Sequence, residues 1–111
     1  MYLNIERISV DHDARALVLT DSERPIFSWT AQSDGDGGVQ RSYRVVVSYA
    51  RGVVWDSGEI QTKKQSAVYG GAPLVSGEKY TVTVTVTDDR GVKSQPESAC
   101  FCYLEQRRWI A

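Results

Sequence analysis

The chain has 111 residues, enough for one domain with a hydrophobic core but too few for a second domain. Hydrophobic residues make up 41% and charged residues 24% of the chain, which is typical of a folded globular domain rather than a disordered or collagen-like segment. Thirteen basic and fourteen acidic residues give a net charge of −1, which excludes the broad positive field on which nucleic-acid binding depends.

Two further features of the sequence bear on membranes and export. No apolar run approaches the roughly 20 residues of a membrane-spanning helix, so we expect no membrane partner. The start of the chain, MYLNIE at 1–6, has neither the basic stretch nor the apolar core of a secretory signal peptide. The compartment stays open, because Met1 need not be the native start.

Apolar and polar residues alternate repeatedly along the chain, whereas the i, i+3, i+4 spacing of an amphipathic helix is not sustained anywhere. The pattern predicts an all-β domain with strands at 3–10, 26–31, 43–49, 53–55, 65–69, 80–87 and 99–103. The clearest strand is YTVTVTVT at 80–87, in which tyrosine and valines face one side and threonines the other. Turn-forming segments rich in glycine separate the strands, at 33–38, 51–52, 56–58, 70–71, 76–77 and 88–91.

Seven short strands at this spacing predict an antiparallel β-sandwich of the immunoglobulin-like class. Tyr80 opens the longest strand after Leu74 and the turn at 76–77, where a tyrosine corner would place its hydroxyl against backbone a few residues upstream. A plain core tyrosine is the alternative. The Cys-Trp-Cys framework of a true immunoglobulin domain is missing from the sequence, which favours the fibronectin type III variant.

The two cysteines, Cys100 and Cys102, lie in an expected strand, where side chains at i and i+2 are about 6–7 Å apart on one face. That separation is too large for an unstrained disulfide, so we expect free thiols, with a C-x-C metal pair as the alternative. A structural zinc site usually has four ligands, and the only histidine, His12, is far away in the sequence. We therefore expect neither a metal nor a cofactor.

The acidic residues give no indication of an active site. Those in turn-forming surroundings are Asp11, Asp13, Asp34, Asp36, Asp88 and Asp89. We expect them to be solvated turn formers, because aspartate side chains hydrogen-bond nearby backbone in turns. His12 lies among charged residues and is expected at the surface, and DGDG at 34–37 lacks the closing glutamate of a calcium loop. The sequence thus predicts no catalytic residue.

The aromatic residues exceed what one core of this size needs. Beyond those assigned to the core, four are possible docking or sugar-contact residues: Tyr49, Trp55, Tyr69 and Trp109. An exposed ring either stacks on a sugar or packs against a neighbouring domain. The remaining alternative is that Trp55 only covers an edge of the sandwich.

A series of short motifs resembles one family of enzymes. In chain order they are RPIFSW at 24–29, SYRV at 42–45, WDSG at 55–58, YGG at 69–71 with Leu74, GEKY at 77–80, and Asp88 or Asp89 with Gly91 and Ser94. Their order and spacing resemble the N-terminal fibronectin type III-like domain of bacterial α-L-rhamnosidases.

The resemblance implies a non-catalytic N-terminal accessory domain that acts as a spacer or docking module. Its parent would be a glycoside hydrolase of carbohydrate metabolism that removes terminal L-rhamnose from glycans or glycosides. It also implies a sandwich at 1–104 and a linker at 105–111 into a following domain, with other domains of the same polypeptide as partners. The alternatives are a carbohydrate-binding module, whose partner would be a sugar, and a generic fibronectin type III interaction module.

Overall fold

The computed structural model describes residues 3–11, 13, 17–33 and 39–104. All regular elements within these ranges are strands, as the alternation predicts. They are β1 (Leu3–Val10), β2 (Leu17–Thr20), β3 (Ile26–Ser33), β4 (Gln40–Tyr49), β5 (Gly52–Asp56), β6 (Ile60–Gln61), β7 (Ser66–Val68), β8 (Lys79–Asp88) and β9 (Glu97–Tyr103). The described part of the chain holds no helix that is long and apolar enough to span a membrane.

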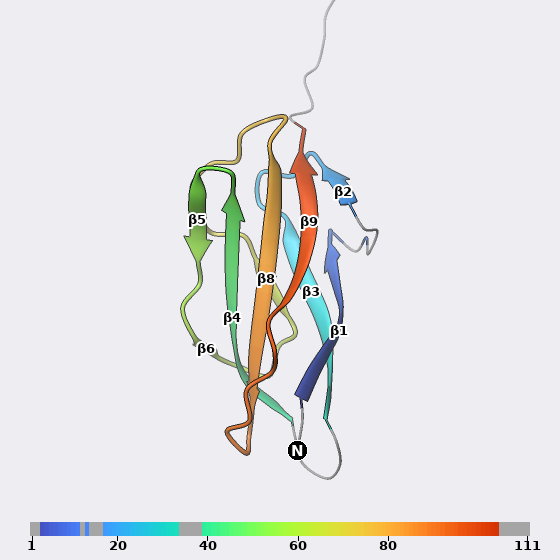
Figure 1. The fold of residues 1–111 in the computed structure, drawn as a ribbon, viewed down its shortest axis with the longest axis vertical. Coiled ribbons are helices and arrows are strands. Elements are labelled where there is room, and N and C mark those ends of the chain that lie inside the picture. Colours follow the sequence, from blue (N-terminus) through green and yellow to red (C-terminus); the bar gives the residue numbers. More distant parts are fainter. Residues whose placement is uncertain (1–2, 12, 14–16, 34–38, 105–111) are drawn as a thin grey trace, which may run out of the picture.

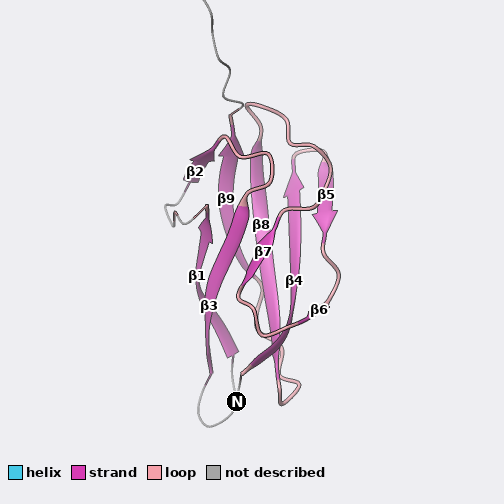
Figure 2. Ribbon diagram, turned by 180° about the vertical axis from the view of Figure 1, so that it is seen from behind, coloured by secondary structure: helices cyan, strands magenta, loops and turns pink. Residues whose placement is uncertain are grey.

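The strands form two sheets stacked as a sandwich, which confirms the predicted class (Figure 1). The smaller sheet has the order β1-β3-β7, and the larger has the order β2-β9-β8-β4-β5 with β6 paired to β4. Figure 2 shows the same molecule from behind, with the smaller sheet in front of the larger one. Every strand pairing is antiparallel except that of β2 with β9, which is parallel.

The described residues form nine strands where the sequence pattern predicts seven, and the two additional strands are β2 and β6. β6 has only two residues, which pair with Ser42 and Tyr43 of β4, and two residues are too few to show a period. β2 has four residues and owes its place to pairing with β9 near the other end of the chain. Such a non-local contact leaves no trace in local alternation, so the strand count was wrong while the architecture was right.

The core lies between the sheets and is built from alternate residues of the long strands. Along β8 the inward side chains are fully buried, in order Tyr80, Val82, Val84 and Val86. Phe27 and Trp29 of β3 enter the core from the smaller sheet, and Trp29 is only 4% exposed. Its indole N–H donates to Oε1 of Gln40 at 3.0 Å, which satisfies the one polar atom of the ring inside the core.

The predicted tyrosine corner is present at the start of β8. The hydroxyl oxygen of Tyr80 accepts a hydrogen bond from the backbone N–H of Val75 at 2.8 Å, and the ring is buried. The turn between them contains Gly77, whose φ of 90° is a left-handed conformation that glycine adopts without strain. The N–H of Gly77 donates to the carbonyl of Tyr103 at 2.7 Å, so this corner also fixes the end of β9.

Candidate functional site

Two of the four aromatic residues predicted to be available for contacts lie together on one edge of the core. Tyr69 is 1% exposed, so its ring offers no face to a sugar or a partner. Trp55 of β5 is half-buried and packs edge-on against Tyr69, with ring centroids 5.5 Å apart, and against Phe27 at 6.3 Å. Trp55 therefore closes the space between the sheets at the β5 edge.

A glycine explains how Trp55 fits this position. A Cβ at Gly71 would overlap the Cβ of Trp55 and the carbonyl oxygen of Val54, and would lie 2.8 Å from the hydroxyl of Tyr69. The YGG motif thus brings the 69–71 backbone directly onto the tryptophan, with φ values in the ordinary negative range at both glycines. At Gly71 the absence of a side chain therefore serves close packing.

The other two predicted aromatics differ from this pair. Tyr49 at the end of β4 is half-buried and stacks on Tyr80, with centroids 5.3 Å apart and planes 21° apart, so the core covers one of its faces. Trp109 lies outside the described residues, as does the linker at 105–111.

The WDSG motif connects β4 and β5 through side-chain and backbone hydrogen bonds. Asp56 accepts hydrogen bonds from Nε of Arg44 at 3.0 Å and from the N–H of Gly58 at 2.9 Å. The bond from Arg44 lowers the pKa of Asp56 to about 2, and the bond from Gly58 adds to the effect. Ser57 exchanges two bonds with the backbone of Val45, accepting at 2.8 Å through its hydroxyl and donating at 2.9 Å through its N–H. The motif residues therefore hold strand edges together.

Asp88 overturns the expectation of a solvated acid. It is 0% exposed, and its carboxylate accepts hydrogen bonds from Nε of Arg90 at 2.8 Å and from the backbone N–H groups of Arg90 and Val92, both at 2.9 Å. Burial acts to raise the pKa of Asp88, but these hydrogen bonds outweigh it and hold the pKa below its ordinary value. Asp88 stabilises a turn, as predicted, but its side chain is buried and not solvated.

Asp11 is likewise half-buried and serves as a junction between strands. Its carboxylate accepts hydrogen bonds from the N–H of Ile26 at 2.9 Å and from the hydroxyl of Thr20. It therefore connects the end of β1 to the end of β2 and the start of β3. His12, Asp34 and Asp36 lie outside the described residues.

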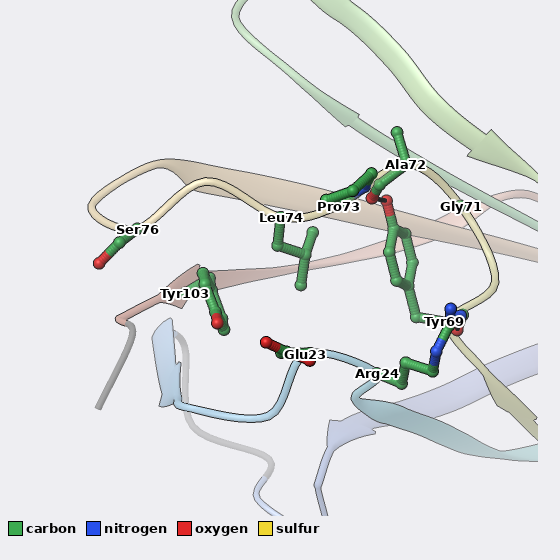
Figure 3. A pocket seen from close by; sticks show the side chains of 9 residues that line it. All are labelled: Glu23, Arg24, Tyr69, Gly71, Ala72, Pro73, Leu74, Ser76 and Tyr103. Carbon is green, nitrogen blue, oxygen red and sulfur yellow. Dashed lines mark hydrogen bonds between the residues drawn. The ribbon is translucent and has the colours of Figure 1, made fainter. Parts of the chain in front are cut away.

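A hollow of about 400 Å³ opens at the end of the sandwich where β9 finishes (Figure 3). Leu74 lies between Tyr69 and Tyr103, and Glu23 and Arg24 approach from the loop between β2 and β3. Burial raises the pKa of Tyr69 to about 12, so its phenol stays protonated near neutral pH and does not act as a base.

The lining of the hollow does not match the machinery of a glycosidase. Its described residues include one carboxyl group, that of Glu23, whereas most glycosidases use two carboxyl groups that flank the scissile bond. Arg24 donates from Nη1 to the backbone carbonyl of Tyr69 at 3.4 Å, which joins the two walls. The hollow is a surface feature at a loop junction.

One feature that the sequence pattern misses is an apolar area on the outer face of the larger sheet. β2 runs parallel to the second half of β9, with Leu17 opposite Cys100 and Leu19 opposite Cys102. Leu17 is 45% and Leu19 is 63% exposed, the two cysteines are half-buried free thiols, and Leu104 just beyond β9 is 43% exposed. We call these five residues the leucine–cysteine patch. The signal in the sequence was LVLT at 17–20, whose alternation is too short to identify a strand on its own.

Comparisons with known proteins agree with this architecture. The model of the family described as Rha78A-like, N-terminal immunoglobulin domain matches residues 5–102. An α-L-rhamnosidase of Formosa agariphila is 24% identical over 96% of this chain, which covers 12% of that protein. Among solved structures, the α-L-rhamnosidase of Streptomyces avermitilis complexed with L-rhamnose superposes with a TM-score of 0.82 at 28% identity, over 92% of this chain and 10% of the other.

A smaller solved structure shows the same general fold. Fibronectin(III)-like modules of CbhA from Clostridium thermocellum superpose with a TM-score of 0.58 at 18% identity, over 90% of this chain and 99% of the other. The likeness to these modules extends to the fold alone. By contrast, the chain spans only about a tenth of the length of the two rhamnosidases that it matches.

Proposed function

Because the chain belongs to the family of Rha78A-like N-terminal immunoglobulin domains, we propose that it is a non-catalytic accessory domain of an α-L-rhamnosidase. The observation that carries the proposal is that nearly the whole chain matches rhamnosidases and yet makes up only about a tenth of them. A segment of that size belongs to a much larger protein, in which the hydrolysis of terminal L-rhamnose would take place on other domains.

The positions of the first and last strands support a role as a spacer. β1 begins at one end of the sandwich and β9 finishes at the opposite end, so the long axis of the domain separates the two points at which neighbouring segments would attach (Figure 1). Two sheets around one packed core make such a body stiff. The domain would therefore hold its neighbours at a fixed separation and perform no chemistry itself.

The test compares the 111-residue chain with the complete product of its gene, on an aryl α-L-rhamnoside. We expect turnover by the complete protein and none by the chain alone, even at a large molar excess. A complete protein from which residues 1–104 are removed serves as the matched control, because it keeps the proposed catalytic domain and lacks this one. Turnover by the 111-residue chain, or a folded complete protein without rhamnosidase activity, would overturn the proposal.

A sugar-binding role receives less support from the packing of the aromatic residues. Tyr69 is buried, Trp55 covers the core edge, and Tyr49 has one face against Tyr80. Stacking on a sugar needs an open ring face that is held in place. Titration of the 111-residue chain with L-rhamnose, followed by chemical shifts of Trp55 and Tyr49, is the direct measurement of this alternative.

A further inference from the structure

The leucine–cysteine patch lies where β2 and β9 run side by side. Side chains alternate along both strands, and Val18, Phe101 and Tyr103 point into the core and are buried. Their neighbours Leu17 and Leu19 must then point outward, next to the two cysteines. The result is an apolar area beside a part of the sheet face that carries threonine and serine, such as the hydrogen-bonded pair Thr83 and Ser98.

The chain leaves the sandwich at the border of this patch. The backbone N–H of Leu104 donates to the carbonyl of Thr20 at 2.9 Å, which fixes the last described residue beside the end of β2. Polypeptide that continues from Leu104 therefore starts beside the exposed leucines. With a linker as short as the one expected at 105–111, a following domain would have an effective concentration near the patch in the millimolar range, so even a small apolar contact would suffice to hold it.

We infer that the leucine–cysteine patch is the docking surface for the domain that follows this one in the same polypeptide. The inference rests on the proposed function and deepens it by naming the partner and the surface. Two observations favour this occupant: the chain end is anchored at the patch, and the relatives have about nine-tenths of their length outside the matched part. Lys79, which pairs with Cys102 from β8 and is exposed, gives the patch a cationic border. The docking face of the partner would thus present apolar side chains with a carboxylate at its edge.

Cys100 and Cys102 provide native reporters for the test. The rate of their alkylation by iodoacetamide is measured by peptide mass spectrometry, in the 111-residue chain and in the complete protein. We expect alkylation of both thiols to be at least about tenfold slower in the complete protein, because a docked apolar surface excludes the reagent. Equal rates in the two proteins would overturn the docking inference.

A matched control shows whether slower alkylation reflects coverage of the patch or a lower reactivity of all thiols in the complete protein. Val39 is 50% exposed, and it lies at the far end of the sandwich, where its carbonyl accepts the N–H of Asp89. A thiol introduced by Val39→Cys should react at the same rate in both proteins. In the complete protein, Leu19→Asp should return Cys100 and Cys102 to the rates of the isolated chain, whereas Val39→Asp should not.

The outcomes distinguish this inference from the proposed function. A complete protein that hydrolyses the aryl rhamnoside but leaves both thiols reactive keeps the function and removes the docking surface. Protected thiols in a complete protein without that activity keep the docking surface and overturn the function. Protection that depends on the concentration of the 111-residue chain alone, with a dimer in sedimentation, would make a second copy the occupant and overturn the inference.

Discussion

At the scale of single residues, the hydroxyl of Tyr80 performs one identifiable task, which is to accept the partly buried hydrogen bond of the Val75 N–H. Tyr80→Phe keeps the ring and its stacking on Phe101 but leaves that N–H without this acceptor. We expect a loss of about 1 kcal/mol in the free energy of unfolding, as for the loss of a typical, partly buried hydrogen bond. Urea unfolding of the wild type and the variant measures this difference in free energy. Tyr49→Phe is the control, because Tyr49 is half-buried, and it should change stability by less than about 0.5 kcal/mol.

Asp88 determines how the stability of the domain depends on pH in the acid range. Its pKa is lowered on folding, so its contribution is fully present above the unfolded pKa of about 3.9 and is lost as the pH falls toward the lower folded value. Asp88→Asn keeps an oxygen acceptor for the amides but loses the charge that pairs with Arg90 at 2.6 Å. The stability difference between wild type and variant should be constant from pH 7 to about 5 and should shrink below that. A difference that grows as the pH falls would contradict this assignment.

At the scale of elements, the packing of the 69–71 backbone onto Trp55 closes the β5 edge of the sandwich. Gly71→Ala should cost about 1–3 kcal/mol, because the added methyl group overlaps Trp55 and the backbone of β5. Gly70→Ala is the matched control, since its added Cβ would lie 3.4 Å from Nε1 of Trp55, an ordinary contact. Thermal unfolding of both variants gives the comparison. Equal effects of the two substitutions would show that the close approach at residue 71 does not matter.

The elements also show where sequence reasoning succeeds and where it cannot. The alternation along β8 was enough to place its strand and its inward face, and the turn at 76–77 before Tyr80 indicated the corner, because these features depend on local order. The burial of Asp88 was not predictable, since its turn sequence resembles any solvated turn. The amides of Arg90 and Val92 come from that same turn, whereas the burial of the turn depends on the packing of the whole fold. The leucine–cysteine patch was missed for the same kind of reason: it exists only once β2 lies beside β9.

At the scale of the whole molecule, the two sheets share a single core and should unfold together. The ring centroids of Phe27 in the smaller sheet and Phe101 in the larger one are 5.6 Å apart. Trp55 and Tyr69 pack on Phe27 from the edge of the sandwich. The apolar inner face of each sheet is buried only by the other sheet. Small single domains of this kind unfold in one cooperative transition.

Trp29 provides a reporter in the smaller sheet for testing this cooperativity. With Trp55→Phe and Trp109→Phe, Trp29 is the single tryptophan of the chain, which has three. Its fluorescence and the far-ultraviolet circular dichroism, to which the larger sheet contributes most strands, should then give the same urea midpoint. The Trp55→Phe change alone is the control for any loss of edge packing. A lower urea midpoint for the Trp29 fluorescence than for the circular dichroism would mean that the smaller sheet detaches first. A domain that opens in this way would be a poor spacer between its neighbours.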